Sequence, residues 1–153
     1  MKKFDSDFAE VHQHLTEMAT LAQTMVSLVA ECVCDRSTDR RQAIDDSEER
    51  MDQLHTKVDA EAVRLLTVYG PVASDLRMIL VVTHVTSQFE RMGDQVINVC
   101  QALDLMRSDP SHGTLPELHK MAELVCEMVN DALTAYFDKD AEKATTTRAR
   151  TAK

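Results

Sequence analysis

Apolar side chains recur every three or four residues along most of the chain, which is the period of an amphipathic helix. We expect four helices, over residues 7–34, 38–69, 72–107 and 115–137. Glycine and proline are scarce, with 3 of each, and the pair Gly70-Pro71 separates the second expected helix from the third. Glycine suits a helix C-terminal cap, and proline suits the first turn of the next helix. The pattern predicts an all-α fold, a long antiparallel helix bundle.

The first and fourth expected helices each have an apolar face that should point into the core. The inward positions of the first are Phe8, Val11, Leu15, Met18, Leu21, Ala22, Met25, Leu28, Val29 and Cys32. Those of the fourth are Leu118, Met121, Leu124, Val125, Met128, Leu133 and Phe137. Burial is worth about 25 cal/mol per Å² of apolar area, so the fourth helix should fold back or dock on another chain.

Composition and charge narrow the class of protein. The 153 residues carry a net charge of -9 and no basic stripe interleaved with aromatic residues, which argues against a nucleic-acid partner. No run of about 18 apolar residues stands out, so we expect no membrane insertion. Four cysteines without a CxxC pair indicate reduced thiols in a cytoplasmic protein.

Two pairs of carboxylates stand four residues apart on expected helices: Glu90 with Asp94, and Glu48 with Asp52. Like charges at this spacing repel, so a cation, a nearby arginine or solvent must offset the cost. A carboxylate cluster without cysteine selects hard cations or iron rather than structural zinc. The alternatives are a solvated acidic face and ion pairs with arginines. Gly93, between Glu90 and Asp94, indicates close packing against the backbone.

Signatures of catalysis are scarce. The chain has no Gly-x-Ser-x-Gly, no Walker loop and no dinucleotide-binding glycine pattern. It also has no Glu-x-x-His, which the ferritin-like di-iron proteins need on two helices. The sequence therefore argues against most classes of enzyme.

The segment Pro71-Val72-Ala73-Ser74-Asp75-Leu76-Arg77, followed by Glu90-Arg91-Met92-Gly93-Asp94, resembles the PhoU family of regulators associated with bacterial phosphate uptake. The resemblance is most specific over residues 39–100. It implies an iron or zinc site, or a site for another divalent metal, at Glu90 and Asp94 with Glu48 and Asp52 as partners. It assigns Asp75, Arg77 and Arg91 to partner binding or structural ion pairs.

The same resemblance implies a cytoplasmic adaptor, commonly a homodimer, that contacts the phosphate ABC transporter and a sensor histidine kinase. The family's two tandem three-helix repeats suggest a division of this chain. We expect a PhoU-like three-helix repeat over residues 1–109, the first helix of an incomplete second repeat over 114–140, and a tail over 141–153. The tail is rich in Thr, Arg and Ala and should fray or be disordered. The alternative function is a non-catalytic helical oligomerisation or protein-binding module without bound metal.

Overall fold

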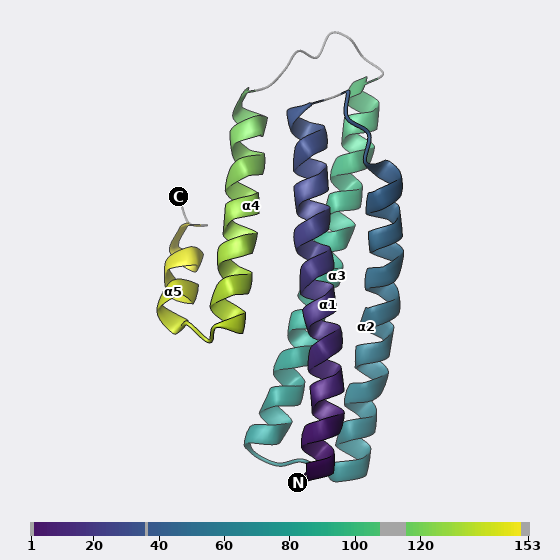
Figure 1. The fold of residues 1–153 in the computed structure, drawn as a ribbon, viewed down its shortest axis with the longest axis vertical. Coiled ribbons are helices and arrows are strands. Elements are labelled where there is room, and N and C mark those ends of the chain that lie inside the picture. The colour runs from purple at the N-terminus through teal and green to yellow at the C-terminus, as the bar shows by residue number, and fades with distance from the viewer. Residues whose placement is uncertain (1, 36, 108–115, 151–153) are drawn as a thin grey trace.

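Five helices follow one another along the chain in this computed structural model, which describes residues 2–35, 37–107 and 116–150. They are α1 (Lys2–Cys34), α2 (Arg41–Tyr69), α3 (Ser74–Arg107), α4 (Pro116–Phe137) and α5 (Ala141–Arg150). Successive long helices run in opposite directions, and α4 lies beside α1 (Figure 1). The predicted all-α antiparallel bundle is confirmed. The expected boundary between residues 109 and 114 lies outside the described residues.

Local hydrogen bonds decide where the helices begin and end. The Asp35 carboxylate accepts from the backbone N–H of Ser37 at 2.9 Å, and this turn delays the start of α2 from the expected residue 38 to Arg41. Gly70 ends α2 in the left-handed conformation, with φ 51°, and its N–H donates to the Leu66 carbonyl. Ala73 has a φ of 50°, so α3 begins at Ser74 rather than at residue 72.

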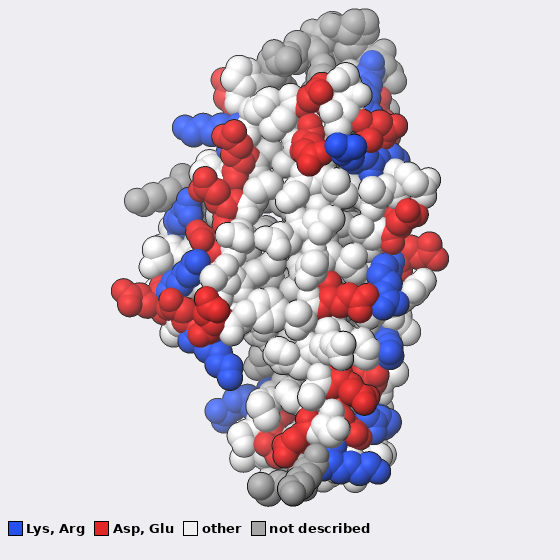
Figure 2. Space-filling view, viewed as in Figure 1, with Lys and Arg blue, Asp and Glu red and all other residues white. Residues whose placement is uncertain are grey.

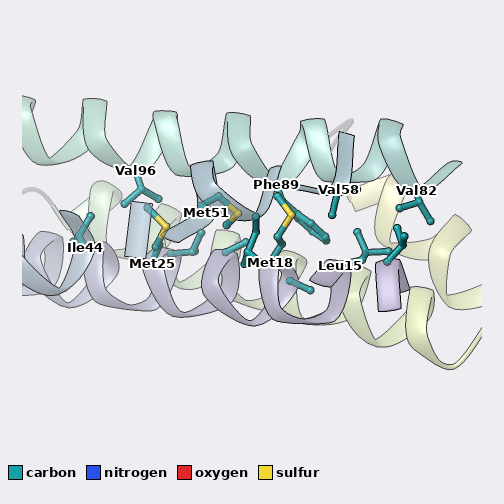
Figure 3. Packing of buried hydrophobic residues seen from close by; sticks show 14 of the residues in the cluster. Leu15, Met18, Met25, Ile44, Met51, Val58, Val82, Phe89 and Val96 are labelled. Atoms are coloured by element: carbon teal, nitrogen blue, oxygen red, sulfur yellow. The ribbon is translucent and has the colours of Figure 1, made fainter. Parts of the chain in front are cut away.

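The core lies between α1, α2 and α3. Figure 3 shows Leu15, Met18 and Met25 of α1 lying among side chains from the other helices, including Met51 and Phe89. The three α1 side chains are fully buried. Flexible methionines fill the irregular space between long helices. The helical period of the first helix therefore predicted the central layer of the core correctly.

Helix α1 is the central element of the fold. It packs against α2, α3 and α4, whereas no Cα of α4 comes within 8 Å of α2 or α3 in the described part of the chain. The outer side of α1 carries Thr16, Thr20 and Thr24, each of which donates its hydroxyl hydrogen to the carbonyl four residues earlier. Figure 2 shows a band of uncharged side chains along the middle of this face, between charged margins.

The apolar composition of α1 also meets a test for membrane helices. Residues Lys3–Cys34 are long and apolar enough to cross a membrane by length and composition alone. A core helix of a water-soluble bundle passes the same test, and the apolar face of α1 packs against three other helices here.

The orientation of α4 differs from the expectation. Met121, Leu124, Val125 and Phe137 were expected to point inward, but they are exposed, with Met121 at 61%. Leu133 packs against the core as expected, and the side chains that join it there are Cys126, Val129 and Tyr136. Apolar residues cover more than one side of α4, and α1 takes only one of those sides. Periodicity alone does not say which side that is.

The expectation of a frayed tail is wrong for residues 141–150, which form α5. The Asp140 carboxylate caps the helix by accepting from the backbone N–H of Lys143 at 2.9 Å. The Arg150 guanidinium binds Asp131 at 2.9 Å and Glu127 at 2.8 Å, both on α4. Residues 151–153 lie outside the described residues.

Candidate functional site

The antiparallel packing of α2 and α3 brings two of the predicted metal ligands toward each other. On α2, Glu48 follows the buried Ile44 by one turn and precedes the buried Met51, so its side chain is half-buried beside the core. On α3, Asp94 directly follows the buried Gly93 and is exposed at the edge of the same interface. The two helices thus contribute carboxylates to one place.

The surroundings of Glu48 disfavour its ionised, negatively charged form. Burial raises the pKa of Glu48 above its ordinary value, and the charges of Asp52 and Asp94 raise it further. A shift of this origin means that Glu48 lacks a compensating cation of its own. Glu48 is therefore repelled by both Asp52 and Asp94, and a bound cation would relieve this repulsion.

The described residues do not close around a metal ion. Nowhere in residues 2–35, 37–107 and 116–150 are three or more His, Cys, Asp or Glu side chains grouped as ligands. Glu90, the fourth predicted ligand, is half-buried on α3 one turn before Asp94. The carboxylate-only donor set fits a hard cation that keeps several waters and needs few direct protein ligands. It does not form a closed tetrahedral site of the structural zinc type.

Other acids on α2 already have partners. Arg41 donates to Asp45 at 2.8 Å, and His55 lies 3.7 Å from Asp59. Both are pairs within one helix, four residues apart, which stabilise a helix by a few tenths of a kcal/mol. This part of the acidic face has a structural explanation, which leaves Glu48 and Asp52 as its candidate ligands.

Asp75, Arg77 and Arg91 form no ion pair with any described residue, and their assignment to partner binding or structural ion pairs stays a prediction. The hydroxyl of Ser74 donates to Asp75 at 3.3 Å. Arg77 and Arg91 are both exposed on α3. Their positive charges are therefore available to a partner or a ligand.

One group of residues was missed from the sequence. His12, Tyr136, Phe137 and Lys139 line a cavity of about 570 Å³ together with Arg77. They come from segments far apart in the chain, and no local spacing marks them as neighbours. The only sequence signal was Arg77, within the segment 71–77.

The family follows from comparison with known proteins. Residues 15–103 match the model of the PhoU domain, which is more than half of the chain. The chain belongs to the PhoU family. The two regions that carried the resemblance, residues 71–77 and 90–94, both lie within the matched segment.

Curated relatives and a crystal structure agree with this assignment. PhoU homologues described as phosphate-specific transport system accessory proteins, from Clostridium acetobutylicum and Aquifex aeolicus, are 26% and 27% identical over 94% and 92% of this chain. The crystal structure of PhoU from Pseudomonas aeruginosa is 28% identical and superposes with a TM-score of 0.85 over 94% of this chain. This chain spans 66% and 63% of the two relatives and 69% of the crystallised chain.

Proposed function

We propose that this chain is an accessory and regulatory protein of a phosphate transport system, and that it acts as an adaptor rather than as an enzyme. The observation that carries the proposal is the match in fold and sequence to PhoU from Pseudomonas aeruginosa over 94% of this chain. The names of the curated relatives describe accessory proteins of a phosphate-specific transport system. An adaptor works through fixed surfaces, and a bundle with a close-packed core provides them.

The proposed partners are the phosphate ABC transporter and a sensor histidine kinase, on the cytoplasmic side of the membrane, with a homodimer as the working form. Two features support a role in protein binding. Arg77 and Arg91 are exposed and have no ion-pair partner among the described residues. Met121 and Leu124 on α4 expose apolar surface of the kind that protein interfaces bury.

A reporter assay tests the regulatory role. The chain is expressed in bacteria that lack their own PhoU protein and carry a phosphate-responsive promoter fused to a reporter. We expect reporter output at high phosphate to fall. The double charge reversal Arg77→Glu/Arg91→Glu should abolish this effect at equal protein level, and Lys120→Glu on α4 serves as the control. Unchanged output with the wild-type chain would overturn the proposal.

We also propose that Glu48, Asp52, Asp94 and Glu90 bind a metal, with Glu90 one turn before Asp94 on α3. The support is the raised pKa of Glu48, which is caused mainly by burial and further by repulsion from Asp52 and Asp94, because a nearby cation would offset both. Iron, zinc or another divalent metal is the expected ion. The carboxylate donors and their open arrangement favour an ion that retains water.

Elemental analysis of the purified, tag-free protein tests the metal proposal. Near-stoichiometric metal is expected in the wild type and not in Glu48→Gln/Asp94→Asn or Glu90→Gln/Asp94→Asn. Asp46→Asn is the matched control, because Asp46 is an exposed acid on the same helix and binds Gln42. Equal metal in all four proteins would contradict the assignment of these ligands.

The second candidate function is a helical oligomerisation or protein-binding module without bound metal. The exposed apolar residues on α4 favour it, as does the absence of a closed ligand group among the described residues. Metal-free protein with a light-scattering mass of two chains at micromolar concentration would support this alternative. A mass of one chain would contradict the homodimer in both proposals.

A further inference from the structure

A cavity opens at the end of the bundle where α3 begins and α4 ends. Its volume is about 570 Å³, within the range of about 300–1,000 Å³ that is usual for small-molecule sites. Its apolar lining consists of Phe8, Met78, Val81, Val82, Tyr136 and Phe137. The cavity therefore has room for a ligand with an apolar body.

Aromatic rings dominate one wall. The ring of His12 stacks on Tyr136 with the centroids 6.5 Å apart, and Tyr136 meets Phe137 edge to face at 5.3 Å. Phe137 stays 38% exposed although it belongs to this cluster. An exposed aromatic ring in a cavity wall offers a surface on which a planar group can stack.

The polar lining is cationic. Arg77 and Lys139 both line the cavity, together with the Ser74 hydroxyl and the His12 imidazole, and no carboxylate is among the lining residues that the structure describes. Neither Arg77 nor Lys139 has an ion-pair partner within the described residues. Arg40, Arg50 and Arg64, by contrast, each form an ion pair with an acid.

The backbone at the cavity is held in a costly conformation. Among the described residues, the non-glycine positions with positive φ are Ala73, at 50°, and Lys139, at 56°. Ala73 precedes Ser74, and Lys139 follows the end of α4, where glycine is usual. Lys139 occupies the left-handed cap of α4, where the N–H of Asp140 donates to the Ala135 carbonyl, and a lysine here costs stability relative to glycine.

We propose that this cavity binds an aromatic organic phosphate of the size of a nucleoside monophosphate. The ring system lies against Tyr136 and Phe137, and the phosphate lies between Arg77 and Lys139. Charge-assisted hydrogen bonds from guanidinium and ammonium groups favour a phosphate over a neutral group. Ser74 is also the first residue of α3, where the helix dipole favours an anion. This binding does not depend on a role in phosphate transport.

Calorimetric titration of the wild-type chain tests the proposal with three probes: adenosine 5′-monophosphate, adenosine and inorganic phosphate. We expect the monophosphate to bind at least about tenfold more tightly than either part alone, since both halves of the cavity are used. The proposal is overturned if the monophosphate does not bind, or if it binds no more tightly than adenosine. If the monophosphate does not bind and the protein has the mass of a dimer in solution, a second copy of the chain covers the cavity. This outcome also overturns the proposal.

Matched variants locate the site. Arg77→Ala and Lys139→Gly should each weaken binding of the monophosphate about tenfold. Arg91→Ala is the control, because Arg91 is an exposed arginine on the same helix that lines a different cavity. Lys139→Gly should leave the melting temperature unchanged or higher, since glycine tolerates the positive φ. Equal binding by Arg77→Ala and Arg91→Ala would show that the ligand does not use this cavity.

Discussion

The side chain of Met25 on α1 lies against the backbone of Gly93 on α3. A Cβ placed at Gly93 would stand 3.5 Å from Met25 Cε and 4.0 Å from Met51 Cγ. Helices α1, α2 and α3 thus come together at this glycine, between the two acids Glu90 and Asp94. The structure gives Gly93 a packing role, as expected from its position inside a helix, and leaves room for one methyl group but no more.

We predict that Gly93→Ala raises the free energy of unfolding by up to about 1 kcal/mol, because alanine favours the helix and its methyl group fits. Urea unfolding followed by circular dichroism measures the change. Gly93→Leu should instead lower the free energy of unfolding by about 1–3 kcal/mol, because the side chain would overlap Met25 and Met51. A destabilised Gly93→Ala variant would contradict this account of the packing.

The sequence predicted the parts of the fold that depend on local periodicity. Leu15 and Met18 were placed correctly, because the apolar face of α1 packs against several helices. Met121 was not, because α4 is apolar over a wide arc and only its contact with α1 decides which side is buried. The helix at residues 141–150 was missed because its stability depends on contacts with α4.

For the candidate site too, the sequence predicted features within one helix but not the contacts between helices. Glu48 and Asp94 were named from their spacing within each helix, but their approach depends on the register between α2 and α3. The presence of Arg77 and Lys139 in one cavity depends on where α4 ends relative to α3. The left-handed backbone at Ala73 was not predicted either, because such a conformation is usually marked by glycine and here the residue is alanine. The register between helices depends on how they pack, and residue spacing within one helix does not predict it.

In the metal-free protein, Glu48→Gln should raise the melting temperature at pH 7 and have no such effect at pH 4. The raised pKa of Glu48 means that the folded state holds the proton more tightly than the unfolded state. Stability therefore falls as the pH rises from the ordinary glutamate pKa, about 4.3, through the higher folded value. Removing the charge relieves repulsion worth about 0.2–0.5 kcal/mol for each like-charge pair on the helix. Glu49→Gln, at an exposed neighbour, should change the melting temperature less.

Asp7→Asn should lower the melting temperature at pH 7, and the loss should shrink as the pH falls. Hydrogen bonds from Arg64, at 2.8 Å, and from the Tyr69 hydroxyl, at 2.9 Å, lower the pKa of Asp7. A lowered folded pKa gives stability that is present at neutral pH and is lost as the pH falls below about 3.9. Asp5→Asn is the control on the same helix. Equal effects of the two variants at pH 7 would contradict this role for Asp7.

Arg150→Ala should release α5 without unfolding the bundle. The ion pairs of Arg150 with Asp131 and Glu127 lie at the surface, where such pairs contribute about 0.2–1 kcal/mol each. Hydrogen exchange of the α5 amides should become faster, whereas the melting temperature should not change. The wild type in 1 M salt should show the same local change, because salt screens exposed charges at about this concentration. Protection of α5 that persists in the variant would mean that the buried Thr147 and the ion pair of Lys143 with Asp131, at 3.4 Å, are enough to hold it.

Among the described helices, α4 packs against α1 and α5 and not against α2 or α3, so the α4–α5 hairpin and the α1–α3 core are two units that differ in how far each depends on the other. Loss of the α4–α5 hairpin would leave the α1–α3 core with its central layer intact, whereas the hairpin has no core of its own. The hairpin therefore behaves as an arm whose opening costs less free energy than global unfolding. When the arm opens, it uncovers the side of α1 that carries Val26, whose carbonyl faces the Cys126 thiol in the closed molecule. One helix thus serves both as the centre of the stable core and as the surface from which a weaker unit can detach.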